Sequence, residues 1–214
     1  MRNTICTLVI TSFCTLGIAS AQLVSFGVKG GVSLTDPDRY KGESKRYIVG
    51  PSVEVRLPLG FAVEVDALYR RVGSSFSYVF PTLNPDGTPA NTTIASYNRQ
   101  RGNSWEFPIL AKYYFRSRSS AWQPFLATGY AFRATWSESK TTLLTIDNLK
   151  NTVQTNAFKS NSTTGPDVGA VVAAGMRFNR GRFAVVPEFR YTYWGANNTD
   201  RPKNEGSFLL GFHF

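Results

Sequence analysis

Cysteine is nearly absent from this chain: only Cys6 and Cys14 occur among 214 residues, both close to the N-terminus. The rest of the chain has no thiol for a disulfide, a thiolate metal site or a cysteine nucleophile. Lipid attachment at Cys14 is disfavoured, because the preceding Thr11-Ser12-Phe13 matches the Leu-small-small pattern of lipoproteins poorly. We therefore expect no disulfide and no thiol chemistry.

Long apolar runs are also missing. Beyond the N-terminus no stretch approaches the 18 residues that would predict a transmembrane helix. The apolar stretch from Ile5 to Ile18 follows Arg2 and precedes Ala19-Ser20-Ala21, which is the pattern of a secretory signal peptide. The alternative, a membrane anchor, is disfavoured because the run is too short and too polar to cross about 30 Å of hydrocarbon. We predict a signal peptide over residues 1–21, cleavage between Ala21 and Gln22, and one mature domain over residues 22–214.

Histidine occurs once, as His213. The sequence shows no metal-spaced His/Cys cluster, no glycine-rich phosphate loop and no dinucleotide fingerprint. A Ser-His-Asp arrangement would have to use His213, which lies beside the C-terminus. We expect no cofactor, no metal ion, no catalytic residue and no enzymatic activity.

Aromatic and apolar residues are plentiful, and they recur at every second position, as in β-strands with one apolar face. The C-terminal stretch is the clearest case, with Phe208, Leu210, Phe212 and Phe214 on one face. This alternation predicts eight strands, over residues 24–32, 47–57, 61–72, 105–115, 126–136, 168–178, 183–193 and 207–214.

Two architectures would cover such faces, a soluble β-sandwich and a transmembrane barrel. The predicted connections favour the barrel over the sandwich, because long connections at one end and short ones at the other are typical of transmembrane barrels. The long connections are 33–46, 73–104, 137–165 and 195–206, and the short ones are 58–60, 117–122 and 179–181.

Aromatic residues are predicted to form two girdles, one at each membrane interface. The girdle at the long-connection ends consists of Tyr47, Tyr78, Trp105, Trp136, Tyr193 and Trp194, and the girdle at the short-connection ends of Phe61, Phe115, Trp122, Phe178, Phe183 and Phe214. An even strand number also closes a sheet without an edge. The prediction is an all-β fold: an eight-stranded antiparallel transmembrane up-and-down β-barrel with long extracellular loops and short periplasmic turns.

The segments FGVKGGVSL, PILAKYYF, QPFLATGYAF and FLLGFHF resemble the small eight-stranded outer-membrane β-barrel (porin-like) family of Gram-negative bacteria. The resemblance covers essentially the whole mature chain. It implies an outer-membrane location and contact with outer-membrane lipids and lipopolysaccharide. The last strand is similar to the signal that the outer-membrane assembly machinery reads, so Phe208, Leu210, Phe212 and Phe214 are expected to face lipid and to act as that signal. Enzymes with this fold need a histidine near the outer leaflet, whereas His213 is expected at the periplasmic rim.

The chain is basic, with a formal net charge of +10 and a pI near 9.8. Such a charge could belong to a solvated surface or to a nucleic-acid-binding one. Strand alternation instead points much of the excess inward, so nucleic acid is not an expected partner. The residues expected to form a polar network in the lumen are Lys29, Glu54, Arg56, Glu64, Asp66, Arg70, Glu106, Lys112, Arg133, Arg177, Glu188 and Arg190.

These seven cations and five carboxylates could interlock as a plug, or they could line a narrow anion-favouring pore. An eight-stranded barrel is only wide enough for side chains to fill it, which favours the plug. Two functions remain open: a structural or surface-interaction protein, with long loops that meet an extracellular ligand or surface, and a passive transporter of small or hydrophobic solutes. We expect a monomer.

Overall fold

The computed structural model describes residues 23–35, 45–150, 152–195 and 203–214. The predicted signal peptide, with Ala21 and Gln22, lies outside these residues. The described part of the chain contains no helix long and apolar enough to cross a membrane. Its strands are β1 (Val24–Ser33), β2 (Tyr47–Arg56), β3 (Phe61–Asp66), β4 (Leu68–Leu83), β5 (Pro89–Tyr114), β6 (Trp122–Asp147), β7 (Thr152–Arg180), β8 (Phe183–Trp194) and β9 (Asn204–His213).

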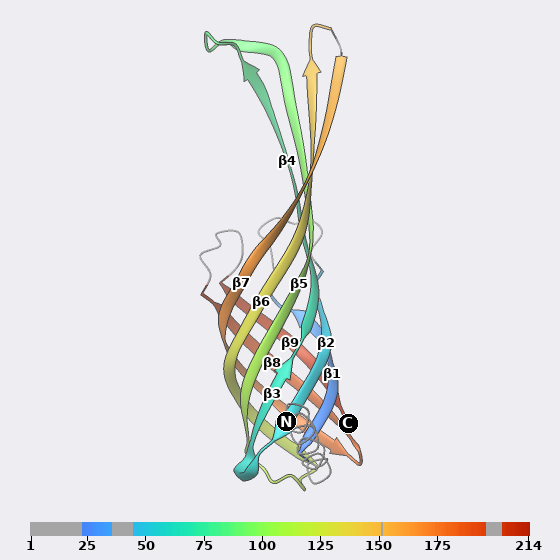
Figure 1. Cartoon of the computed structure of the whole chain (residues 1–214), viewed down its shortest axis with the longest axis vertical. Coiled ribbons are helices and arrows are strands. Elements are labelled where there is room, and N and C mark those ends of the chain that lie inside the picture. Colours follow the sequence, from blue (N-terminus) through green and yellow to red (C-terminus); the bar gives the residue numbers. More distant parts are fainter. Residues whose placement is uncertain (1–22, 36–44, 151, 196–202) are drawn as a thin grey trace, which may run out of the picture.

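The strands form one closed antiparallel barrel, shown in the lower half of Figure 1. Sequence neighbours pair with each other, and β1 closes the sheet by pairing with both β2 and β9. β3 and β4 are two parts of one barrel strand, because β2 pairs with both in the same register. Ser52 on β2 pairs with Asp66 on β3, and Val49, three residues earlier on β2, pairs with Tyr69 on β4. Pro51 and Pro108 flank the break between them, and proline has no N–H for the ladder. The predicted eight-stranded barrel is therefore confirmed.

Alternate residues face opposite sides of the barrel wall, as the sequence predicts. On β8, Ala184, Val186 and Glu188 are buried in the interior, while Phe183 and Phe189 are exposed on the outside. Apolar side chains facing out and polar ones facing in are the arrangement of an outer-membrane barrel. The outer apolar surface therefore contacts lipid.

The connections 73–104 and 137–165 were predicted to be loops, and this is wrong: the structure shows strands there. β4 and β5 stay paired up to Leu83–Pro89, and β6 and β7 up to Asp147–Thr152. β5 and β6 also remain paired, from Tyr114–Phe125 to Thr92–Asp147. The result is a four-stranded sheet above the barrel, here called the β extension (residues 72–83, 89–104, 137–147 and 152–166; Figure 1).

The connections at the opposite end are short, as predicted. They follow β2, β5 and β7, and two of them use left-handed backbone, with φ of 83° at Gly60 and 65° at Gly181. Glycine takes this conformation without steric cost. Leu59 adopts it as well, with φ of 61°, and its side chain is exposed. Leu23, the first described residue, lies at this end because its carbonyl accepts a hydrogen bond from the backbone N–H of Arg56 at 2.7 Å, and Phe214 lies there because it pairs with Phe26.

The predicted aromatic girdles need two corrections. Trp194 is 1% exposed and points into the barrel, because β8 alternates inward at that position. Tyr78 lies on the β extension, well above the barrel rim. Tyr47, Trp136 and Tyr193 do lie exposed near the upper rim, and Phe115, Trp122 and Phe183 near the lower one.

Candidate functional site

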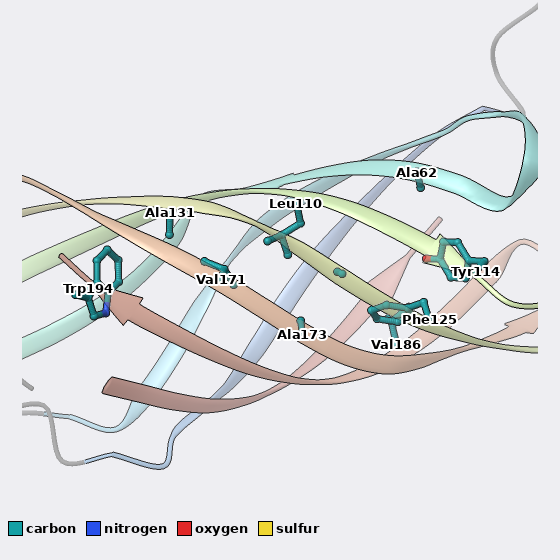
Figure 2. Close-up of a cluster of buried hydrophobic side chains, with 10 residues drawn as sticks. Ala62, Leu110, Tyr114, Phe125, Ala131, Val171, Ala173, Val186 and Trp194 are labelled. Carbon is teal, nitrogen blue, oxygen red and sulfur yellow. The ribbon is translucent and has the colours of Figure 1, made fainter. Parts of the chain in front are cut away.

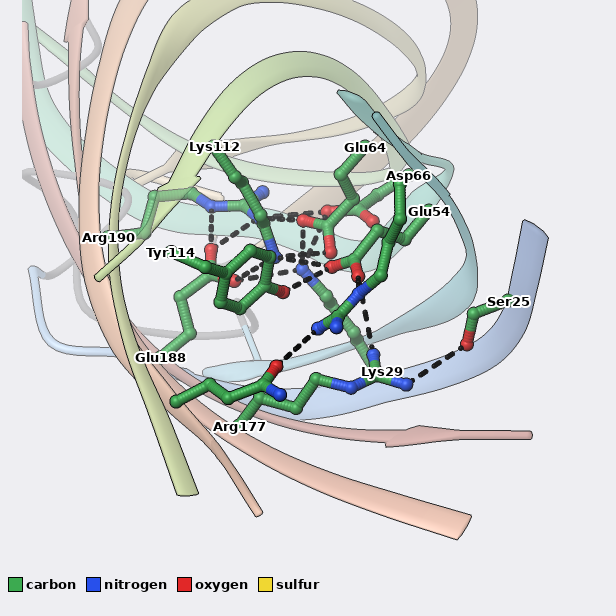
Figure 3. A network of polar contacts seen from close by, with 12 residues as sticks. Ser25, Lys29, Glu54, Glu64, Asp66, Lys112, Tyr114, Arg177, Glu188 and Arg190 are labelled. Atoms are coloured by element: carbon green, nitrogen blue, oxygen red, sulfur yellow. Dashed lines mark hydrogen bonds and ion pairs between the residues drawn. The ribbon is translucent and has the colours of Figure 1, made fainter. Parts of the chain in front are cut away.

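The barrel interior carries most of the buried ionisable side chains, because each strand turns alternate residues inward. The charges of the lower and middle interior form what we call the central network (Figure 3). Its ionisable members are Lys29, Glu54, Arg56, Glu64, Asp66, Lys112, Arg177, Glu188 and Arg190.

Lys29 is the point where opposite walls of the barrel meet. Its Nζ, on β1, donates to Glu64 Oε1 at 2.5 Å, to Glu188 Oε2 at 2.9 Å and to Asp66 Oδ2 at 3.2 Å. Glu64 and Asp66 come from β3, and Glu188 from β8. All four side chains are fully buried. One ammonium group therefore joins three strands through carboxylates.

Lys112 on β5 extends these contacts. Its Nζ donates to Glu64 Oε2 at 2.5 Å and to Glu54 Oε2 at 3.5 Å, and lies 3.6 Å from Glu188 Oε2. Tyr114, two residues along the same strand, donates its hydroxyl to Glu54 Oε2 at 2.6 Å. Glu64 thus bridges Lys29 and Lys112.

Arg190 completes the centre from β8. Its Nη2 donates to Glu188 Oε1 at 2.6 Å and to Asp66 Oδ2 at 2.8 Å, and its Nε donates to Glu188 Oε1 at 2.9 Å. Glu188 and Arg190 lie on the same face because they are two residues apart on one strand. Arg190 and Lys29 therefore share Asp66 and Glu188.

Two arginines connect the network to the lower rim. Arg56 donates to Glu54 at 2.9 Å and to Gln123 at 2.8 Å. Arg177 approaches Glu54 at 3.4 Å and donates to Asn179 at 3.0 Å and to Ser25 at 3.4 Å. Glu54 consequently meets cations from three strands.

A second group of charges, the upper cluster, lies toward the β extension. Arg70 pairs with Glu205, and Arg133 pairs with Asp167 Oδ2 at 3.0 Å and with Glu205 Oε2 at 3.4 Å. The indole of Trp194 donates to Glu205 Oε2 at 3.2 Å, and Arg133 also lies over its ring at 4.0 Å. Glu106 lies between the two groups, where it interacts electrostatically with Glu205, Arg70 and Arg190.

Eleven of the twelve residues expected in the lumen thus make ion pairs there, and Glu106 lies among them without one in the described chain. The structure adds two carboxylates that sequence reasoning missed, Asp167 and Glu205. With them the described interior holds seven cations and seven carboxylates. Glu205 falls within the predicted connection 195–206, but the structure places it on β9, on the same inward face as Ser207.

Apolar side chains fill the space beside the charges (Figure 2). Leu110, Ala131, Val171 and Val186 are essentially inaccessible, and they cluster with Tyr114, Phe125 and Trp194. Lys112 Nζ lies 4.3 Å from the centre of the Phe125 ring. The interior is therefore a mixed polar and apolar core.

The four residues expected to form the assembly signal all lie on the outward face of the C-terminal strand. Phe208, Phe212 and Phe214 are about half exposed or more, and Leu210 is partly exposed. Phe214 pairs with Phe26 through two backbone hydrogen bonds, of 2.8 and 3.1 Å, at the seam that closes the barrel.

His213 points into the barrel near its lower rim and is 1% exposed, so it does not reach the β extension. Neither ring nitrogen has a hydrogen-bond partner among the described residues. No group of three or more His, Cys, Asp or Glu side chains in the described chain is arranged to hold a metal ion.

One family model matches this chain, and several solved structures are similar to it. A family model described as outer membrane protein beta-barrel domain matches residues 20–201. Neisserial surface protein A is 16% identical, with 89% of this chain and 95% of that chain covered and a TM-score of 0.47. The N-terminal β-barrel domain of Pseudomonas aeruginosa OprF is 11% identical, with 89% and 97% covered and a TM-score of 0.43.

A third solved structure is Ail, the attachment invasion locus protein of Yersinia pestis, in complex with the heparin analogue sucrose octasulfate. It is 12% identical, with 90% of this chain and 97% of that chain covered and a TM-score of 0.41. A search of curated proteins found no match.

Proposed function

Because this chain belongs to the outer membrane protein beta-barrel domain family, we propose that it is a closed barrel that holds the β extension at the cell surface. The protein is located in the bacterial outer membrane. In this proposal the barrel is an anchor, and the extension makes contact with an extracellular ligand or surface. The role is structural or adhesive and not enzymatic, and the protein acts as a monomer.

The observation that carries the proposal is the filling of the barrel interior by partnered side chains. Lys29 from β1 meets Glu64 from β3 and Glu188 from β8, so charged groups span the lumen between opposite walls. Apolar side chains such as Leu110 and Val186 occupy the remaining space and are inaccessible to water. An eight-stranded barrel leaves little more room than such side chains need. This supports a barrel that does not conduct.

The β extension supports the surface role. Serine, threonine and asparagine are common on it, and Tyr78, Tyr97 and Phe158 are exposed among them. Exposed aromatic side chains set among small polar residues are typical of protein surfaces that bind other molecules.

Two further proposals concern how the protein reaches the membrane. Residues 1–21 direct export and are removed after Ala21. Phe208, Leu210, Phe212 and Phe214 are the signal for the assembly machinery as well as a lipid-facing surface, supported by their outward position at the barrel seam.

Planar-bilayer recording tests the closed barrel against the narrow pore. Purified full-length mature protein should insert without discrete current steps. The matched control lacks the upper extension, with residues 75–99 and 140–159 removed, and it should be equally silent because closure lies in the barrel. Stable current steps from the full-length protein would support the narrow pore. Current steps from the control alone would mean that the extension, and not the barrel interior, blocks the lumen.

A further inference from the structure

His213, the one histidine of the chain, is packed into the seam at which β1 and β9 close the barrel. It lies opposite Gly27, and its side chain is 1% exposed. A Cβ atom at Gly27 would lie 2.9 Å from Cγ and Nδ1 of the imidazole ring, and one at Gly211 would lie 3.2 Å from Nε2. Because glycine at both positions leaves the space that the ring fills, the ring is held at one place in the seam.

Most of the charges around His213 are positive. Its strongest electrostatic interactions are with charged groups of four strands: Lys29 on β1, Glu54 on β2, Lys112 on β5 and Arg177 on β7 (Figure 3). Three of these four groups are cations. A protonated imidazole would therefore meet more like charge than opposite charge at this site.

Glu54, the carboxylate among these groups, is already engaged. It accepts hydrogen bonds from Arg56 at 2.9 Å and from the hydroxyl of Tyr114 at 2.6 Å. The side chains of Arg177 and Lys112 also donate to it, at 3.4 and 3.5 Å. An added imidazolium would have to share Glu54 with three cations, so it would gain little from this carboxylate.

The described neighbours on β8 and beside the ring on β9 do not supply another carboxylate side chain. On β8 the inward residues beside it are Ala184, which pairs with His213, and Val186. The α-carboxylate of Phe214, next along the chain, accepts the N–H of Phe26 at 3.1 Å. The described interior as a whole holds seven cations and seven carboxylates. Protonation of His213 would add an eighth cation, and an enclosed space disfavours such an imbalance.

The seam can open locally at this point. β9 ends at His213, and beyond it Phe214 is joined to Phe26 by two backbone hydrogen bonds, of 2.8 and 3.1 Å. The end of a strand opens at a smaller free-energy cost than the centre of a sheet. Opening of this end would move the imidazole from the interior into the water at the periplasmic rim, where its protonated form is solvated.

We infer that His213 makes the closing seam of the barrel acid-sensitive: the neutral ring fixes the end of β9 against β1, and protonation releases it. An imidazole in water has a pKa of about 6.5. Because the protonated form is disfavoured in the closed seam, the seam should have its full stability above about pH 6.5 and lose it as the pH falls. The inference goes beyond the proposed function and depends neither on conduction through the lumen nor on binding by the β extension.

Amide hydrogen exchange of the mature protein in lipid nanodiscs tests this inference. The amides of Phe26 and Phe214 each donate to the other's backbone oxygen, so their protection factors, which are corrected for the intrinsic effect of pH on exchange, report opening of the seam. Because one proton is taken up on opening, these factors should fall by about thirtyfold between about pH 7.5 and 5. The ladder between β5 and β6 around Leu110 and Gly129 lies away from the seam and should keep its protection.

Variants of His213 separate its titration from other effects of acid. His213→Gln keeps a neutral polar side chain, so its seam amides should be protected equally at both pH values. His213→Phe keeps a ring of similar shape and gives the same test if glutamine prevents folding. The matched control adds Ser77→His to His213→Gln. Ser77 is exposed on the β extension, so a histidine there is solvated and should not restore the pH dependence. Restored pH dependence would contradict a role for the seam.

Three further results would overturn the inference. One is a wild-type seam whose protection does not change with pH, and another is an equal fall in wild type and His213→Gln. The third is an equal loss of protection in the β5–β6 ladder of the wild type, because acid would then weaken the whole barrel and not the seam.

Discussion

At the scale of single residues, Glu64 shows what the interior charges contribute. It lies between Lys29 and Lys112, at 2.5 Å from each. Glu64→Gln would leave both ammonium groups short of a counter-charge, and removal of one partner of a buried pair costs about 3–5 kcal/mol. Because Asp66 and Glu188 remain as counter-charges, the loss of unfolding free energy should lie near the lower end of this range. Urea-induced unfolding in lipid vesicles measures this loss.

The control for this prediction is a double-mutant cycle. The double variant Glu64→Gln/Lys112→Met removes one charge of each sign. Its loss of unfolding free energy should therefore be smaller than the sum of the losses in the two single variants. Strict additivity would mean that the pair does not interact in the membrane.

The neighbouring Val65 tests the opposite face of the same strand. It is 44% exposed and lies on the outer apolar wall. Val65→Arg should cost about 2–4 kcal/mol near the bilayer midplane, while Val65→Leu should change little. Normal folding of Val65→Arg, together with higher stability of Glu64→Leu, would mean that the faces are reversed.

Alternation alone was enough to place most of the inward residues, because a strand side chain can face only one of two ways. Asp167 and Glu205 were missed for a different reason. Both lie next to stretches of Asn, Thr, Gly and Pro that gave no hydrophobic alternation to count. The predicted interior contains seven cations but five carboxylates. Because an enclosed space disfavours unbalanced charge, this inequality already indicates that further carboxylates face inward.

At the scale of elements, the C-terminal strand carries a prediction about assembly. Phe214→Asp should sharply lower the amount of folded protein in the outer membrane, as judged by heat-modified migration on gels. The matched control is Phe183→Asp on the neighbouring strand, because Phe183 is 68% exposed, close to the 66% of Phe214, and lies at the same end of the barrel. Equal losses from both variants would indicate only lipid contact, and no special role for the C-terminus.

The β extension is expected to be separable from the barrel. The deletions of residues 75–99 and 140–159 each remove the upper part of one hairpin. The residues joined by each deletion already pair across the sheet, Ser74 with Gln100 and Ser139 with Ser160. Closing shorter loops carries a smaller entropic cost, so the barrel should still fold in detergent or lipid. Loss of the heat-modified folded form would show instead that the extension is required for barrel formation.

The extension also marks the limit of the sequence prediction. Residues such as Ser75, Ser77, Asn98 and Thr141 lack the apolar alternation that identifies a strand. They form strands because each hairpin continues a ladder that the barrel has already set in register. That non-local cause cannot be read from a single stretch of sequence.

At the scale of the whole molecule, the central claim is that the barrel interior excludes water. Both cysteines of the chain, Cys6 and Cys14, lie within residues 1–21, so single cysteines can be placed at will in protein refolded without those residues. Ala127 lies on the inward face of β6 and is 6% exposed, whereas Ser77 is exposed on the extension.

The most direct test is the rate at which a small charged methanethiosulfonate reagent labels Ala127→Cys and Ser77→Cys in lipid vesicles. The account predicts rapid labelling of Ser77→Cys and almost none of Ala127→Cys, with equal rates once urea unfolds the protein. Rapid labelling of Ala127→Cys in the folded protein would contradict it, because it would show a water-filled lumen.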